Sequence, residues 1–359
     1  MWNDGGVTSL TTPNGESLSP AQRQRAVGTV VVAATGDALG APYEFQPPLP
    51  DSEDVEMIGG GILDWQPGEW TDDTAMAIVV LEASLAASDA HDLRTDTAQD
   101  HIAREWYSWS LGTPDIGTLT SQVVRTAADL AREDGHYAPR AKDFRRAADL
   151  AHESLPASAG NGSLMRVHVT VLPYLLSPVE DAIEAIEAVC RLTHVHEDTL
   201  EACVLWGLAV RHAVLTGEID IRVGLEQLAE DRRALWLERI EEAEQSTPVM
   251  FRRNGWVVGA FQASWAAVTG VSPLPEGKFA RREALIAALE ASVRAGYDTD
   301  TIACITGSLL GAVLGPKAVP PDWRRSLFGW PGYEVEELEG LVERVIAPMT
   351  SPDEERAGG

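Results

Sequence analysis

Apolar residues recur along most of this chain at the three- and four-residue spacing of amphipathic helices, and strand-like alternation is almost absent. Ser19 followed by Pro20 predicts the start of the first helix, because serine caps free N–H groups and proline suits the first helical turn. Gly40 and Pro42 predict its end. A second helix is expected from Thr71 onward. Further helices are predicted at Thr97–Leu111, Leu119–Glu133, Lys142–His152, Ser163–Leu176, Val179–Leu192, Thr199–Leu215, Val223–Glu244, Gly255–Val268, Ala280–Ala295, Thr301–Leu314 and Val335–Ile346.

These helices are expected to form a single domain. Residues 41–69 are a loop rich in Pro and Gly, and Val167–Val171, which alternates briefly, has helical neighbours. The sequence shows no repeat at a solenoid period and no long linker. Residues 1–20 and 351–359 are typical of flexible tails. The sequence therefore predicts one compact all-α domain over residues 21–350.

Composition narrows the class of protein. Hydrophobic residues make up 45% of the chain but aromatic residues only 6%, and alanine is abundant, which favours packed helices. The formal net charge of −27 argues against nucleic acid or an anionic membrane surface as a partner. The three cysteines lack paired spacing, as in a reducing compartment. No signal peptide or apolar run of membrane-spanning length is evident, so we expect a cytoplasmic location.

Two acidic clusters, more than two hundred residues apart, begin apolar, alanine-rich segments. They are Thr71-Asp72-Asp73-Thr74 and Asp298-Thr299-Asp300-Thr301. Carboxylate and hydroxyl oxygens are hard ligands, which suit Mg²⁺ or Mn²⁺ better than zinc or iron. If the fold brings the clusters together, their four negative charges need cations between them. The pattern therefore predicts a two-metal site that acts on an oxygen-rich substrate.

Simpler interpretations exist for each motif alone. Thr71 with two following aspartates is also the pattern of an ordinary helix cap, which stabilises a helix by roughly 0.5–2 kcal/mol. The glycine-rich segment from Gly160 to Arg166 could hold a phosphate at a helix N-terminus, or form an ordinary turn. His194 ends a predicted helix, where a protonated imidazole is favourable whatever the function.

Known motifs that use similar residues do not match. An EF-hand would have glycine where Ala303 stands, and the acidic box of an isoprenoid synthase would have aspartate at Met76. A zinc-protease motif at His196 would need a second histidine at Leu200.

Taken together and in order, the motifs resemble the ADP-ribosylglycohydrolase family. That family includes the dinitrogenase-reductase-activating glycohydrolases and the vertebrate ADP-ribosylarginine and ADP-ribosylserine hydrolases. The resemblance covers about residues 24 to 315, and the pair of acidic clusters is its most specific part. The matching stretches are Gly36 to Phe45, Trp70 to Met76, Gly160 to Arg166, Thr193-His194, Asn254 to Ala260 and Gly296 to Gly307.

The resemblance implies a compact all-α fold with a cleft for two Mg²⁺ or Mn²⁺ ions. It assigns metal-ligand positions to Thr71, Asp72, Asp73, Asp298, Asp300 and Thr301. Glu44 matches a glutamate on the family's mobile loop near the metals. Asn161, Gly162 and Ser163 match the loop that contacts the diphosphate, His194 matches a substrate-side histidine, and Trp256 falls near the nucleoside end. Tyr297 departs from the family pattern, in which many relatives have a small residue or an amide there.

The expected activity is metal-dependent hydrolysis of the bond between ADP-ribose and a modified side chain, most simply arginine, with ADP-ribose as product. The partner would be an ADP-ribosylated protein or small molecule. Such cleavage passes through an oxocarbenium-like state, and carboxylates shuttle the protons. Glu44 is the candidate acid/base, with Asp73 and Asp300 as competitors. Alternatives are a serine, nucleobase or small-molecule linkage, an ADP-ribose-binding protein without turnover, or an isoprenoid-type synthase.

Overall fold

The computed structural model describes residues 17–87, 91–155 and 158–350. Most of the two expected tails, residues 1–16 and 351–359, lies outside these described residues. Leu18 is buried in the core and its backbone N–H donates to the carbonyl of Met349 over 2.6 Å, so packed structure begins before the first helix.

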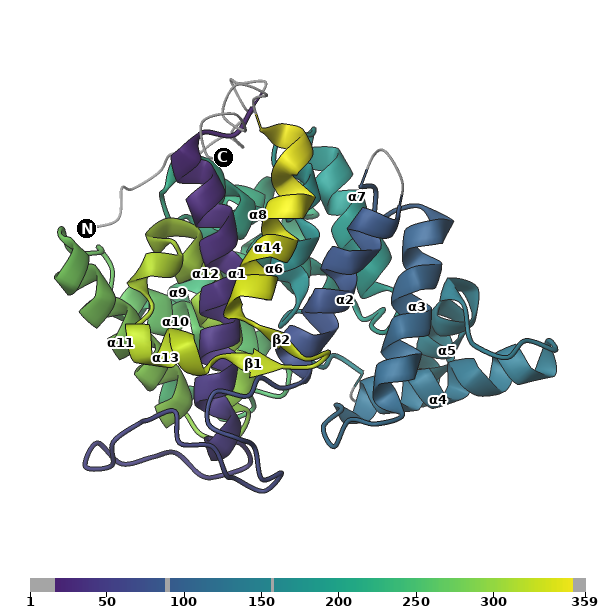
Figure 1. The fold of residues 1–359 in the computed structure, drawn as a ribbon, viewed down its shortest axis with the longest axis horizontal. Helices are drawn as coiled ribbons and strands as arrows, with labels where there is room; N and C mark the ends of the chain where they lie inside the picture. The colour runs from purple at the N-terminus through teal and green to yellow at the C-terminus, as the bar shows by residue number, and fades with distance from the viewer. Residues whose placement is uncertain (1–16, 88–90, 156–157, 351–359) are drawn as a thin grey trace.

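The regular secondary structure of the described residues is almost entirely helical, with one very small antiparallel sheet (Figure 1). The α-helices are α1 (Pro20–Gly40), α2 (Asp72–Ala86), α3 (Asp96–Ser110), α4 (Thr118–Glu133), α5 (Ala141–Ser154), α6 (Val167–Thr170), α7 (Val179–Cys190), α8 (Glu197–Thr216), α9 (Glu230–Glu244), α10 (Val257–Gly270), α11 (Lys278–Arg294), α12 (Thr299–Leu314), α13 (Pro321–Ser326) and α14 (Val335–Ile346). The strands are β1 (Phe328–Gly329) and β2 (Tyr333–Glu334). The all-α prediction is confirmed.

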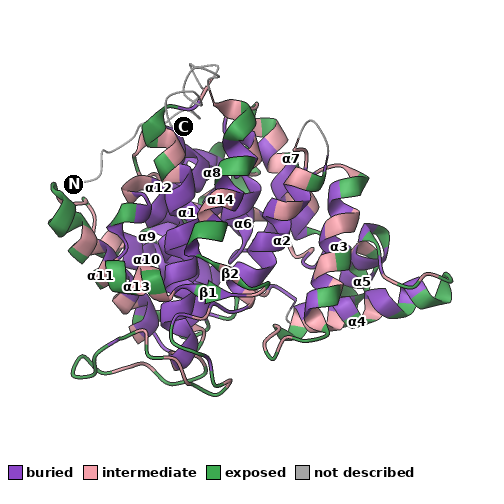
Figure 2. Ribbon diagram, in the orientation of Figure 1, coloured by how far each residue is buried: buried purple, intermediate pink, exposed green. Residues whose placement is uncertain are grey.

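Helix α1 starts and ends where the sequence indicates. The Ser19 side chain accepts from the Gln22 backbone N–H, and the Gln22 side chain accepts from the Ser19 N–H, which forms a capping box. The helix ends at Gly40. Between these ends, α1 is buried from Ala26 onward and forms part of the centre of the molecule (Figure 2).

Helices α1 and α12 pack backbone against backbone, through glycines on both. A Cβ atom on Gly28 would lie 2.4 Å from the carbonyl oxygen of Gly311, and one on Gly36 would lie 2.1 Å from that of Ala303. A Cβ on Gly40 would lie 2.4 Å from Cα of Asp300. Only glycine permits such an approach. This close contact between α1 and α12, called the seam below, therefore places the C-terminal end of α1 directly against the second acidic cluster.

Helix α8 completes the centre of the core. By length and composition α8 could cross a membrane, so the prediction that no apolar run reaches membrane-spanning length is wrong. In the structure 83% of its apolar window is buried inside the protein, as expected for a central core helix. The three cysteines are buried and form no disulfide, in agreement with their lack of paired spacing.

Two long helices predicted from the sequence are broken in the structure. The segment Ser163–Leu176 forms turns, the short α6 and a 3₁₀ turn at Leu172–Tyr174, because Pro173 has no N–H to continue a helix. The segment Val223–Glu244 divides into a 3₁₀ segment at Ile221–Gln227 and α9. The break is at Leu228, which is extended and whose carbonyl accepts from the Arg233 guanidinium.

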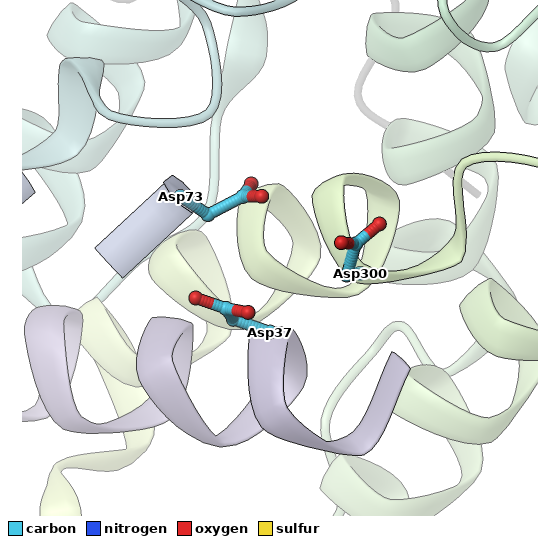
Figure 3. A group of neighbouring side chains, drawn as sticks. All are labelled: Asp37, Asp73 and Asp300. Atoms are coloured by element: carbon cyan, nitrogen blue, oxygen red, sulfur yellow. The ribbon is translucent and has the colours of Figure 1, made fainter. Parts of the chain in front are cut away.

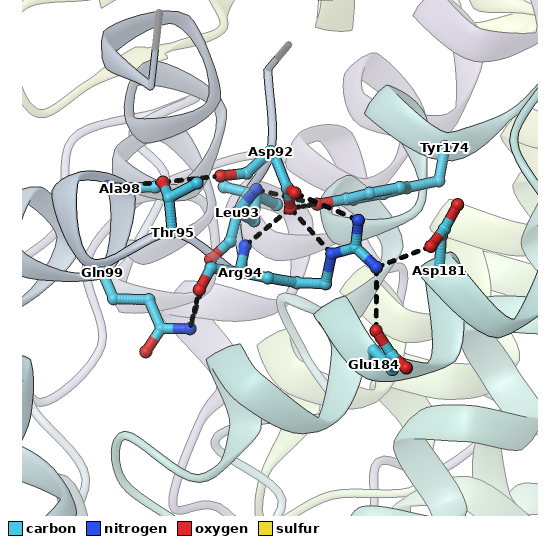
Figure 4. Close-up of polar contacts among 9 residues, drawn as sticks. All are labelled: Asp92, Leu93, Arg94, Thr95, Ala98, Gln99, Tyr174, Asp181 and Glu184. Carbon is cyan, nitrogen blue, oxygen red and sulfur yellow. Dashed lines mark hydrogen bonds and ion pairs between the residues drawn. The ribbon is translucent and has the colours of Figure 1, made fainter.

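Helices α3, α4 and α5 form a lobe at the side of the molecule (Figure 1). An ion-pair network before α3 joins this lobe to α7 (Figure 4). The Arg94 guanidinium contacts Asp92 at 2.9 Å, Asp181 at 2.6 Å and Glu184 at 2.8 Å, while the Tyr174 hydroxyl donates to Asp92 over 2.8 Å. Because these groups are partly exposed, each ion pair contributes little to the stability of the fold.

Candidate active site

Carboxylates from three separate helices meet at one point (Figure 3). They belong to Asp37 on α1, Asp73 on α2 and Asp300 on α12, and one oxygen of each lies within 4.8 Å of the others. All three residues are buried. The convergence of the two remote acidic clusters, predicted from the sequence, is thus present in the fold.

Asp37 holds the first acidic cluster in place. One of its carboxylate oxygens accepts from the Thr71 N–H over 2.9 Å and from the Thr71 hydroxyl over 2.8 Å. The other accepts from the N–H of Thr74 over 3.0 Å and from its hydroxyl over 2.5 Å. Thr71 occupies the N-cap position of α2, but its side chain makes no capping hydrogen bond to that helix. Thr71 therefore stands at the N-cap position with two aspartates in the first turn, as that interpretation expects, but its hydroxyl binds Asp37 instead of capping the helix.

The threonine hydroxyls and carboxylates form a compact oxygen cluster. The Thr71 hydroxyl lies 3.3 Å from an Asp73 oxygen and 3.4 Å from an Asp300 oxygen. The Thr301 hydroxyl lies 3.3 Å from the same Asp73 oxygen. The other oxygen of Asp73 is buried without a hydrogen-bond partner.

A cavity of about 370 Å³ opens directly onto this cluster. Asp72, Asp298, Asp300 and Thr301 line it. The Asp298 carboxylate also accepts from the Asn161 side-chain amide over 2.8 Å, which ties the second acidic cluster to the glycine-rich loop.

Glu44 and Asp115 enter the same cavity from two loops. One oxygen of Glu44, one of Asp115 and one of Asp300 lie within 4.8 Å of one another. Glu44 Oε2 and Asp115 Oδ2 are both buried without a hydrogen-bond partner. The sequence predicts a site role for Glu44 but not for Asp115.

The cluster is strongly destabilised when its carboxyl groups are charged. Burial is the largest cause, followed for Glu44 by Asp115, and together they raise the pKa of Glu44 to about 10. Burial, with Asp37 next, raises the pKa of Asp115 to about 7. The pKa values of Asp72, Asp73 and Asp300 are also raised by burial and then by neighbouring carboxylates.

The donor set fits hard divalent cations. It offers carboxylate and hydroxyl oxygens, several of them buried with no other partner. Positive charge between these groups would relieve both the repulsion and the missing hydrogen bonds.

The buried side chain of Arg166 holds the glycine-rich loop, residues 160–166, through hydrogen bonds. The Arg166 guanidinium donates to the Gly162 carbonyl, to the Ser163 hydroxyl over 3.2 Å and to the Thr193 hydroxyl over 2.7 Å. It also stacks 4.3 Å from the Trp106 ring centroid. The loop is therefore fixed to the segment that precedes His194.

His194 lines the cavity beside that loop. Its Nδ1 lies 2.8 Å from the Thr193 hydroxyl and 3.2 Å from that of Ser163. Burial and then the charge of Arg166 lower the pKa of His194 to about 3. Such a low pKa disfavours the protonated imidazole that the helix-cap interpretation of His194 requires.

A second cavity of about 910 Å³ adjoins the first and shares Glu44, Phe45, Gly160, Gly255 and Asp298 with it. Trp256 lines this larger cavity and pairs with Gly160 through a short backbone bridge.

The structure brings most of the proposed site residues together. Asn161 and Gly162 line the smaller cavity and Trp256 the larger one, whereas Ser163 is buried behind the wall and contacts His194 and Arg166. The site also includes two aspartates to which the sequence analysis gave no role. Asp37 carried a signal, a charged residue within an apolar helix. Asp115 carried none, since it lies in a polar loop.

Comparison with known proteins decides the family. The model of the ADP-ribosylglycohydrolase family matches residues 18–355. The chain belongs to the ADP-ribosylglycohydrolase family. It is accordingly an enzyme, and its class is hydrolysis of ADP-ribosyl bonds. Membership excludes the isoprenoid-type synthase and argues against a binding protein without turnover.

Similar proteins in the family act on several targets. An ADP-ribosylarginine hydrolase, Tri1 of Serratia proteamaculans, is 23% identical and the match covers 96% of this chain and 82% of that protein. The ADP-ribosylhydrolase ARH3 of Bos taurus is 28% identical over 89% of this chain and 92% of its own. The ADP-ribosyl-[dinitrogen reductase] glycohydrolase of Rhodospirillum rubrum is 27% identical, and the match covers 86% of this chain and 92% of that protein.

A solved structure shares the fold of this ADP-ribosylglycohydrolase. It is an ADP-ribosylglycohydrolase-related protein complex, which superimposes with a TM-score of 0.62 at 25% identity and covers 92% of this chain and 100% of that one.

Proposed function

We propose that this ADP-ribosylglycohydrolase uses two Mg²⁺ or Mn²⁺ ions to cleave the bond between ADP-ribose and an arginine side chain, and releases ADP-ribose. The observation that supports this most is the meeting of Asp73 and Asp300, with Thr71 and Thr301, at the base of an acidic cavity. The arginine linkage is supported by the name of the Tri1 relatives from Serratia proteamaculans and Pseudomonas putida.

The residues that would hold the cations are Thr71, Asp72, Asp73, Asp298, Asp300 and Thr301. When bound, such ions supply positive charge that orients the vicinal hydroxyls of the distal ribose and polarises a water molecule. Asp37 keeps Thr71 and the start of α2 in position through its hydrogen bonds to Thr71 and Thr74.

Glu44 is our candidate for the acid/base. It faces the cavity with one buried, unpartnered oxygen, beside Asp115 and Asp300. Cleavage of a glycosyl bond requires a proton on the leaving nitrogen and removal of one from the attacking water. Without cations the pKa of Glu44 is raised to about 10. Bound cations would lower it, so that the carboxyl could give up a proton as well as hold one. Asp73 and Asp300 are the competing candidates.

The remaining residues would bind the rest of ADP-ribose. Asn161 and Gly162 face the cavity from the loop that Arg166 fixes, next to the neutral His194. Backbone N–H groups of such a loop suit a diphosphate. Trp256, in the adjoining cavity, suits the nucleoside end. We expect the enzyme in the cytoplasm, with an ADP-ribosylated protein or small molecule as substrate.

The test is hydrolysis of ADP-ribosylarginine by the purified chain, with Mg²⁺ or Mn²⁺ and with chelator. We expect release of ADP-ribose that needs the metal. Asp300→Ala should abolish it, while circular dichroism shows unchanged helical content. Unchanged activity of Asp300→Ala would refute the site. Cleavage of ADP-ribosylserine or of an ADP-ribosylated nucleobase, but not of the arginine conjugate, would refute the linkage and leave the site standing.

A further inference from the structure

Two large aromatic residues are adjacent in sequence to the carboxylates of the site. Phe45 follows Glu44, and Tyr297 precedes Asp298. The two segments are hydrogen bonded to each other, since the Phe45 N–H donates to the Tyr297 carbonyl over 2.6 Å and the Tyr297 N–H donates to the Gln46 carbonyl over 2.7 Å. The loop that contains Glu44 is thus fastened to the second acidic cluster at these aromatic residues.

Both aromatic residues have an unfavourable backbone conformation. Phe45 has a φ of 62° and Tyr297 a φ of 63°. For residues other than glycine, this region is sterically unfavourable. Packing does not explain the choice of residue, because the side chains are 56% and 37% exposed. Strained and exposed aromatic residues at a cavity are a feature of functional surfaces.

Their place in the cavity indicates what they contact. Both line the 910 Å³ cavity, and Phe45 also lines the smaller cavity above the acidic cluster. The bond to be broken is on the ribose next to that cluster. Consecutive Cα atoms are about 3.8 Å apart, so neighbours of Glu44 and Asp298 lie near this ribose. The leaving group is attached to the same ribose, whereas adenine lies beyond the diphosphate.

We propose that Phe45 and Tyr297 form an aromatic subsite that binds the guanidinium of the leaving arginine. This inference rests on the proposed function and specifies its leaving group. A guanidinium stays charged at neutral pH and stacks on aromatic faces. The carboxyl oxygens of Glu44 and Asp298 share the cavity and can accept hydrogen bonds from a guanidinium. A neutral serine hydroxyl gains little from such a surface, so the subsite selects for arginine.

Trp256 provides a matched control. It lines the same cavity and is 37% exposed, like Tyr297, but its backbone pairs with Gly160 of the glycine-rich loop. Arg252 and Arg253 precede it and line the cavity too. Their positive charge suits a diphosphate rather than a guanidinium. This part of the cavity therefore belongs to the nucleotide half of the substrate.

The experiment compares Tyr297→Asn, Tyr297→Phe and Trp256→Ala with the wild type. Asparagine removes the ring but tolerates positive φ, so the variant is expected to fold, and a thermal melt verifies this. Agmatine, which has the guanidinium side chain of arginine without the carboxylate, serves as the probe. Kinetics gives kcat/KM for ADP-ribosylagmatine. Calorimetry gives the Kd of ADP-ribose and the Kd of agmatine for the complex of enzyme and ADP-ribose.

Tyr297→Asn should lower kcat/KM roughly 5- to 30-fold, mainly through KM, and weaken agmatine by the same factor. It should leave the Kd of ADP-ribose within about twofold, and Tyr297→Phe should restore both values. Trp256→Ala should instead weaken ADP-ribose. The subsite would be overturned if Tyr297→Asn weakened ADP-ribose as much as it weakened agmatine, or if it left the affinity for agmatine unchanged. If the wild type does not cleave ADP-ribosylagmatine, the proposed function fails, and agmatine binding still decides the subsite.

Discussion

The contact between α1 and α12 can be tested with a single methyl group. In Gly40→Ala the new Cβ would lie 2.4 Å from both Cα and N of Asp300, which are backbone atoms. Ordinary contacts between such atoms are about 3.5–4.0 Å, so α1 and α12 must separate by roughly 1 Å. Overpacking of this kind costs about 1–3 kcal/mol. Asp300 would move relative to Asp37 and Asp73, and a 1 Å displacement at a catalytic site lowers activity by about 100-fold.

Two other glycines separate the local effect from the general one. Gly28→Ala brings a Cβ to 2.4 Å from the Gly311 carbonyl oxygen, in the same seam but about 18 Å further along α1. Gly28→Ala should lower the midpoint of thermal unfolding about as much as Gly40→Ala does, yet leave the activity of the folded protein unchanged. Gly340→Ala places its Cβ in open space within α14 and should stabilise by about 0.5–1 kcal/mol.

The assays are thermal unfolding and kcat/KM for ADP-ribosylarginine, with the concentration of folded enzyme determined by titration with ADP-ribose. Wild-type stability of Gly40→Ala would show that the two backbones do not touch there. Equal loss of activity in Gly28→Ala and Gly40→Ala would show that the seam does not act through Asp300, and would refute the reasoning.

Three further predictions follow from the site. Asp37→Asn replaces an acceptor oxygen with a donor and leaves buried groups of Thr71 or Thr74 unpaired. With saturating Mn²⁺ present to offset the repulsion between carboxylates, urea unfolding should show a loss of about 1–3 kcal/mol; no loss would contradict the hydrogen bonds. Without cations, the pKa values of Glu44 and Asp115 in the folded protein are about 10 and about 7, against ordinary values of 4.5 and 3.8. Because the folded state binds these protons more tightly than the unfolded state, protonation stabilises the fold. This stabilisation is complete below about pH 4 and is lost as the pH rises toward 10. Melting curves at pH 5 to 9 should show that decline, and Mn²⁺ should remove it; a decline unaffected by Mn²⁺ would count against cation binding here. Arg166→Lys loses part of the fork that binds Gly162 and Thr193, so kinetics should show a higher KM with little change in kcat, and an unchanged KM would exclude a positioning role.

The sequence was sufficient for most of the fold, because its helices carry local signals. Ser19 and Gly40 mark the ends of α1, and apolar spacing marks the long helices. The errors have physical causes. Pro173 breaks a segment whose apolar pattern continues through it, and β1 and β2 are two residues long, too short to show alternation.

The site was predictable where its residues stand in a specific pattern. The two acidic clusters meet as expected, since the glycines of α1 and α12 bring them together. Asp115 could not be assigned, because an aspartate in a polar loop is ordinary, and only the fold places it near Glu44. The neutral state of His194 likewise follows from burial, which no local pattern reveals.

Binding of cations between the two acidic clusters is the central claim, and anomalous scattering from crystals grown with Mn²⁺ tests it most directly. Two peaks are predicted at the base of the smaller cavity, within about 2.0–2.6 Å of oxygens from Asp73, Asp300 and their neighbours. Crystals that show no manganese there at saturating concentration, or manganese only at the exposed acidic surface, would contradict the account.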